Sequence, residues 1–80
     1  MIQIRKNVAV SDTGFLFNPM TGDSFSVNPI GQVIIRAYQK GKSEEEILEE
    51  ILEAYRVDRS TAEKDLLDFK NMLANYKLID

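Results

Sequence analysis

The spacing of the hydrophobic residues changes once along the chain, and this change restricts the fold more than any other feature of the sequence. Up to Asn28-Pro29, apolar and polar residues alternate, as they do in Ser24-Phe25-Ser26-Val27, which is the period of a half-buried strand. After that point apolar residues recur every three or four positions, which is the period of an amphipathic helix. The chain is therefore expected to place its strands before its helices.

The first part of the chain predicts three short strands joined by tight turns. Apolar residues at alternate positions predict strands over about 2–10, 15–18 and 23–27. The connections at 11–14 and 18–22 are rich in Gly, Asn, Asp and Pro, which favour the backbone angles of turns. Three strands with such short connections form an antiparallel meander.

The first two predicted helices have clear ends in the sequence. They cover about residues 29–40 and 44–55. Asn28-Pro29 supplies a good N-cap followed by a residue whose missing N–H costs nothing at the first helical position. Gly41 can adopt the left-handed conformation that ends a helix. The run Ser43–Glu46 has the form of a capping box, which begins the second helix.

The third helix is predicted over about residues 59–76, with either Asp58 or Ser60 as its N-cap. Its expected buried stripe follows helical spacing and consists of Ala62, Leu66, Phe69, Leu73 and Tyr76. Leu78-Ile79 is a short apolar segment that can hold the end of this helix against the core.

The length of the chain allows one small domain. It has 80 residues, of which 44% are hydrophobic and 29% are charged, as is ordinary for a globular domain. We therefore expect a single domain over residues 1–80 in the α+β class, with a three-stranded antiparallel meander followed by a three-helix bundle.

Two residue types that carry much enzyme chemistry are absent. The chain has neither Cys nor His, which removes thiolate nucleophiles and the commonest general base and metal ligand. Six glutamates between Glu44 and Glu53 are interpreted as a solvated helix face. The three tyrosines, Tyr38, Tyr55 and Tyr76, are expected to pack in the core with their hydroxyls at its rim. No catalytic site, metal or cofactor is predicted.

Charge and hydropathy limit the partners. The formal net charge is -3, and the carboxyl-terminal half carries the acidic excess, with eleven acidic and five basic residues after Lys42. Such a surface is poorly suited to a phosphate backbone. No apolar run approaches the roughly 20 residues that span a bilayer, and no signal peptide opens the chain. A cytoplasmic protein without nucleic-acid or membrane partners is expected.

Several of these signals occur together in an order that resembles a known family. GFLFNPMTGDSFSVNPIGQVII joins two strands through an NPxTG turn to a helix with an early glycine. GKSEEEILEEILEAYRVDRSTAEKDLLDFKNMLANYKLI continues with a capped helix, a Tyr-x-Val-Asp bridge and a last helix before Leu-Ile. Over residues 6–79 the chain resembles the PqqD family of pyrroloquinoline quinone biosynthesis and its relatives beside other peptide-modifying enzymes.

The resemblance implies a winged-helix-like fold that serves as a precursor-peptide recognition element. In that family the leader segment of a ribosomally made peptide adds as a strand beside the third strand, in a cleft bordered by the third helix. The domain performs no chemistry and delivers the peptide to a modifying enzyme such as a radical S-adenosylmethionine protein. Both partners, the precursor peptide and that enzyme, are expected here by resemblance.

The resemblance also indicates which residues bind the peptide. Carried over to this sequence, they are Ser24, Phe25, Ser26, Val27, Asp65, Phe69 and Met72. The choice of helix face stays open at this point, because Leu67 and Lys70 on the other flank of the helix are the alternative to Asp65 and Met72.

Apart from the resemblance, the residues support the addition of a peptide strand to the sheet, and they leave two alternative functions. A three-stranded meander has an open edge that can accept a further strand, and 24–27 carries neither Pro nor charge. The same edge can pair with a second copy of the chain, which would give a homodimer or a structural role. The other alternative is a winged-helix nucleic-acid-binding regulator, which would need basic and amide side chains on its third helix.

Overall fold

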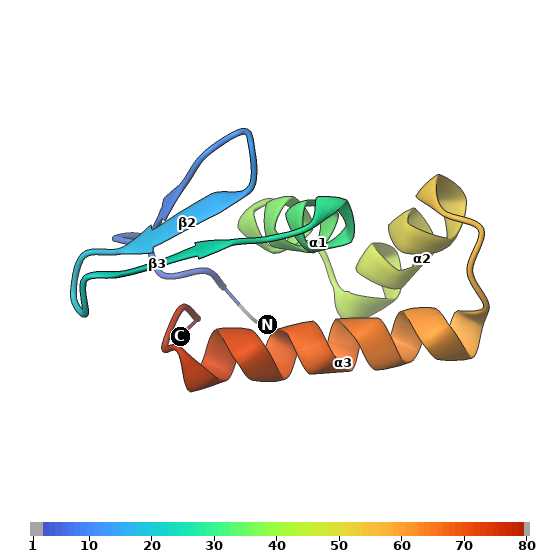
Figure 1. Ribbon diagram of the computed structural model, residues 1–80. Helices are drawn as coiled ribbons and strands as arrows, with labels where there is room; N and C mark the ends of the chain where they lie inside the picture. Colours follow the sequence, from blue (N-terminus) through green and yellow to red (C-terminus); the bar gives the residue numbers. More distant parts are fainter. Residues whose placement is uncertain (1–2, 80) are drawn as a thin grey trace.

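The computed structural model describes residues 3–79 and contains three strands followed by three helices (Figure 1). The strands are β1 (Ala9–Val10), β2 (Phe15–Asn18) and β3 (Asp23–Ser26). The helices are α1 (Pro29–Gln39), α2 (Glu44–Ala54) and α3 (Arg59–Asn75). The α+β class and the order of elements predicted from the change of period are confirmed.

The sheet is an antiparallel meander with the order β1-β2-β3. The turn between β2 and β3 is held by Asn18, whose main-chain carbonyl accepts from the Gly22 N–H at 2.8 Å and whose side chain accepts from the Met20 N–H at 3.0 Å. Gly22 has a φ of 78°, which favours glycine. These bonds fix the register, which places Leu16 opposite Phe25.

The predicted first strand over 2–10 is wrong for most of its length. Only Ala9–Val10 pairs with β2, while Ile4 forms an isolated antiparallel bridge with Ile79. The Val8 N–H donates to the Arg5 carbonyl at 3.0 Å, closing a turn between these two parts. The alternating pattern is therefore divided between two partners, and residue 2 lies outside the described residues.

The core lies between the inner face of the sheet and the three helices. Figure 1 shows α3 running along one side of the molecule, below α1, α2 and the sheet. The side chains that are at most 2% exposed come from all these elements, and the large ones are Leu16, Ile34, Ile35, Tyr38, Ile47, Ile51, Leu73 and Leu78. The burial of Leu78 confirms that the apolar end of the chain is held against the core.

The helix ends follow the local signals with one exception. Asn28 accepts from the Gly31 N–H at 2.8 Å, Gly41 has a φ of 75°, and Ser43–Glu46 forms the complete capping box. At the start of α3, Asp58 occupies the cap position without a side-chain cap hydrogen bond, and Ser60 lies inside the helix. No helix formed by residues 3–79 has the length and apolar character needed to cross a bilayer.

Candidate functional site

β3 is an edge strand, paired with β2 on one side and with no other strand of residues 3–79 on the other. The Val27 N–H donates to the Gly14 carbonyl at 2.8 Å, which marks Val27 as a hydrogen-bonded position of the ladder. Because such positions alternate along an antiparallel pair, Ser24 and Ser26 direct their main-chain N–H and C=O groups away from β2. The edge therefore offers two donors and two acceptors to another strand.

The inner side of this edge meets the end of α3. The ring of Phe25 lies against the ring of Tyr76, with centroids 4.5 Å apart and planes inclined at 50°. Tyr76 is 46% exposed, so its assignment to the buried stripe was wrong. It follows the last residue of α3, and the ring of Phe25 lies against one side of its ring.

A small hollow lies where β3 ends and α1 begins, facing α3. Its volume is about 170 Å³. It is lined by Asn28, Ile30, Gly31, Ile34, Asp65, Asp68 and Phe69. We refer to the outward main-chain groups of Ser24 and Ser26, the Phe25–Tyr76 pair and this hollow together as the edge site.

Gly31 allows α1 and α3 to come close beside the edge site. A Cβ atom at this position would lie 2.7 Å from Cε2 of Phe69 and 3.0 Å from Cβ of Val27, both of which are closer than ordinary contact. The absence of a side chain at Gly31 therefore lets the Phe69 ring pack at the junction between β3 and α1. This close approach helps to position α3 against the junction between β3 and α1.

The two flanks of α3 border different hollows. Asp65 lines the hollow beside Phe69, and Met72, seven residues further on, falls on nearly the same side of the helix. Leu67 and Lys70 instead line a second hollow between α2 and α3, where Lys70 Nζ lies 2.8 Å from Oε1 of Glu44. The alternative flank thus faces α2.

The structure brings the residues expected from the resemblance to one margin of the molecule. Ser24 and Ser26 are exposed, whereas Phe25, Val27, Asp65, Phe69 and Met72 are partly buried. Sequence reasoning did not find Asn28, Asp68 and Tyr76 as neighbours of this margin. The available signal was helical spacing, which places Asp68 and Tyr76 near Asp65 and Phe69 on the last helix. Spacing within one helix does not reveal which other element packs against that side. Peptide contact by all these residues stays a prediction.

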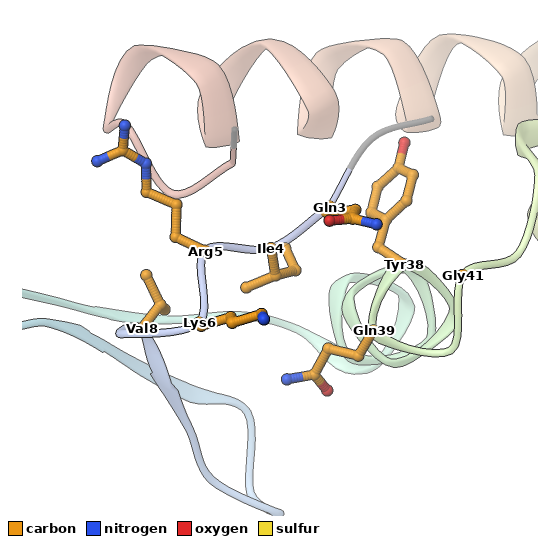
Figure 2. Close-up of a pocket in the computed structure, with 8 residues that line it drawn as sticks. All are labelled: Gln3, Ile4, Arg5, Lys6, Val8, Tyr38, Gln39 and Gly41. Carbon is orange, nitrogen blue, oxygen red and sulfur yellow. The ribbon is translucent and has the colours of Figure 1, made fainter.

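A larger hollow lies elsewhere in the described residues. It has a volume of about 370 Å³ and is formed by the amino-terminal segment against the end of α1 (Figure 2). Its lining consists of Gln3, Ile4, Arg5, Lys6, Val8, Tyr38, Gln39 and Gly41. Its lining contains no carboxylate and no thiol.

The hydroxyl of Tyr38 lies inside the protein instead of at the rim of the core, which corrects the expectation for this residue. Tyr38 is 2% exposed, and its hydroxyl has no hydrogen-bond partner among residues 3–79. Burial, followed by the negative charge of Glu44, raises the pKa of Tyr38 from 10.0 to about 12. The phenol therefore stays protonated at neutral pH.

Five of the six glutamates of α2 take part in ion pairs or in the helix cap. Glu50 pairs with Lys42, Glu45 with Arg59 at 2.9 Å, and Glu44 with Lys70. The main-chain N–H and the hydroxyl of Ser43 both hydrogen-bond with Glu46 and lower the pKa of that carboxyl. Within residues 3–79 no group of three or more acidic side chains could hold a metal ion.

These features define a class of protein: a small α+β domain whose open sheet edge lies beside its last helix. Residues 13–79 match the family described as "Coenzyme PQQ synthesis protein D (PqqD)". The chain belongs to this family, which confirms the resemblance seen in the sequence. No curated protein matches the chain significantly.

Two solved structures are similar over nearly their whole length. One is described as "TbiB1 in Complex with the TbiA(beta) Leader Peptide"; it is 36% identical and has a TM-score of 0.87, with 98% of this chain and 94% of that chain covered. The other is described as "Lasso peptide synthetase B1 complexed with the leader peptide"; it is 21% identical with a TM-score of 0.87, covering 99% and 96% of the two chains. The similarity to this second structure shows that the two chains share a fold.

Proposed function

We propose that this chain is a non-catalytic adapter that binds the leader segment of a ribosomally synthesised precursor peptide and presents it to a modifying enzyme. The main support is the free edge of β3 beside α3, because unpaired main-chain groups can hydrogen-bond an extended peptide. The same kind of partner is present in the TbiB1 complex, whose protein is 36% identical to this chain.

The binding mode is the addition of a strand to the sheet. The outward N–H and C=O groups of Ser24 and Ser26 pair with the peptide, and each such hydrogen bond contributes about 1 kcal/mol net. A backbone contact of this kind accepts many sequences. Affinity therefore depends on the main chain, and selectivity depends on the side chains on either side of it.

Side chains of the peptide that point inward meet α3. The peptide-contacting side chains proposed on this side are Phe25, Val27, Asp65, Phe69 and Met72. Phe69 and Met72 offer apolar surface, and the Met thioether adapts to partners of variable shape. Asp65 and Asp68 make the hollow acidic, so a neutral or basic peptide side chain suits it better than a carboxylate.

The modifying enzyme is the second proposed partner, with a radical S-adenosylmethionine protein as the expected type. The chain itself lacks Cys and His, and its one buried phenol is held protonated at neutral pH. Binding the leader on the adapter raises the concentration of the attached core peptide at the enzyme. The chemistry then belongs to the enzyme.

The nucleic-acid-binding alternative gains no support from the structure. Lys70 of α3 pairs with Glu44, and the hollow beside α3 is lined by Asp65 and Asp68. A phosphate backbone is repelled by such a surface. We therefore retain the peptide adapter alone.

The test is a titration of isotope-labelled protein with the TbiA(beta) leader peptide, followed by the amide resonances. Peptide binding at the edge site should shift Ser24 to Val27 together with the amides of α3 around Phe69. Shifts confined to the hollow of Figure 2, or no shift at millimolar peptide, would count against the proposal. A concentration series without peptide shows whether β3 pairs with a second copy, which would compete for the same edge.

A further inference from the structure

Two phenylalanines are exposed next to each other on the outer face of the sheet. Phe15 is 45% exposed and Phe17 is 39% exposed, whereas Leu16 between them is 1% exposed. The alternation of β2 turns Leu16 into the core and both rings toward solvent. The core therefore does not account for the two rings.

The strands on either side of β2 leave these rings uncovered. Phe17 lies opposite Ala9 of β1 and Ser24 of β3, and Phe15 lies opposite Ser26. Residues opposite each other across an antiparallel pair point to the same face. All three neighbours have small side chains. The two rings therefore form an apolar patch that is accessible from solvent and also from the neighbouring strands in the plane of the sheet.

This patch is continuous with the free edge of β3. Ser24 and Ser26 both flank the rings and present the main-chain groups that a guest strand would pair with. Strands in a sheet are about 4.8 Å apart, so a guest strand lies about 10 Å from β2 with only serine side chains between. A large side chain on the outward face of the guest can reach a phenylalanine ring across that gap.

Taking the peptide-binding function proposed above as given, we propose that the bound strand is recognised on both of its faces. Its inward side chains meet α3, and an aromatic or long apolar side chain opposite Ser24 or Ser26 packs on Phe15 and Phe17. The occupant of the outer patch is thus the same peptide that pairs with β3. The serines are specificity-determining because larger residues there would close the gap.

The experiment selects binders from a display library of random peptides on the intact protein and on three variants. Phe15→Thr combined with Phe17→Thr removes the patch while keeping strand formers in β2. Tyr76→Ala alters the inward side and identifies which alternate peptide positions face α3. Leu67→Gln removes an exposed leucine on the α2 side of α3, 51% exposed, and serves as the matched control. Circular dichroism verifies that each variant folds.

Peptides selected on the intact protein are expected to prefer apolar residues at inward positions and an aromatic or long apolar residue at an outward position. The double variant should lose the outward preference alone, with about tenfold weaker binding of the selected peptides. Leu67→Gln should change neither preference.

Three results would overturn the proposal. The first is the absence of an outward preference on the intact protein, and the second is an outward preference that persists in the double variant. The third is that the intact protein is a dimer, the double variant is a monomer, and both select the same peptides. This result would assign the patch to self-association. If the intact protein selects no peptide at all, the adapter function fails as well, so the two failures are distinguishable.

Discussion

The ring of Phe25 on β3 packs on the ring of Tyr76 at the end of α3, with 4.5 Å between the centroids. Tilted aromatic pairs contribute about 0.5–1.5 kcal/mol beyond the area they bury. The pair ties the sheet edge to the last helix, although the two residues lie far apart in the sequence. It therefore fixes one end of the edge site.

Replacing Tyr76 with Ala should weaken both this link and peptide binding. We expect a loss of about 1 kcal/mol in the free energy of unfolding, because the ring is half exposed and its main partner is Phe25. Urea unfolding and a titration with the leader peptide measure the two effects. Tyr76→Phe keeps the ring pair and should behave like the original protein; a stability loss with unchanged binding would assign the pair a purely structural role.

Ser26→Pro tests the main chain of the edge directly. Proline removes an N–H that points away from β2, so the hairpin keeps its own bonds, and Pro is tolerated on edge strands. Peptide binding should weaken about tenfold, because one backbone hydrogen bond is lost and the ring obstructs the edge. Ser26→Ala removes the side chain alone and is the control. Equal affinity of the two variants would show that the peptide does not pair with this strand.

Gly31→Ala tests the close contact between α1 and α3. The added Cβ would lie 2.7 Å from Cε2 of Phe69, and overpacking of this kind costs about 1–3 kcal/mol. The better helix propensity of Ala returns up to about 1 kcal/mol, so a net loss is expected in urea unfolding. Adding Phe69→Leu should recover part of it if the clash with the ring is the cause. A fully additive double variant would exclude that cause.

Tyr38→Phe tests the buried hydroxyl through pH. The pKa of Tyr38 is raised from 10.0 to about 12, so the folded state holds this proton more tightly than the unfolded chain. The corresponding stability is fully present below pH 10.0 and is lost as the pH rises toward about 12. The original protein should therefore lose on the order of 2 kcal/mol relative to Tyr38→Phe across this window. Parallel pH curves of the two proteins would contradict the burial of the phenol.

Ser43→Ala and Asp58→Ala compare two helix starts. Ser43 accepts from the Glu46 N–H at 3.2 Å, and loss of such a cap costs about 1 kcal/mol. Asp58 makes no side-chain cap hydrogen bond, so its replacement should change stability by a few tenths of a kcal/mol at most. Thermal unfolding of the two variants checks the ranking, and equal losses would mean that Asp58 also caps its helix in solution.

The local parts of the fold could be predicted because their signals lie within a few residues of each other. The Asn28-Pro29 start, the Gly41 stop and the Ser43–Glu46 box each depend on backbone groups one turn away. Turn residues and an apolar period of two likewise predicted the positions of β2 and β3. The pattern failed over residues 2–10, where identical alternation serves two different partners, one of them Ile79 at the other end of the chain.

The edge site could be predicted only in outline. The free edge follows from a meander of three strands, and the resemblance placed Asp65, Phe69 and Met72 on the helix beside it. The periodicity of α3 wrongly assigned Tyr76 to the core. The spacing of apolar residues along one helix does not show how far the neighbouring elements extend beside it.

The sequence by itself determined the order of strands and helices, their ends and the existence of an unpaired strand edge, since these depend on hydrogen bonds and side-chain periods within each segment. Only the tertiary structure decided which side of α3 faces that edge. That choice is a rotation of one packed element against another, set by contacts between distant residues such as Gly31 with Phe69 and Phe25 with Tyr76.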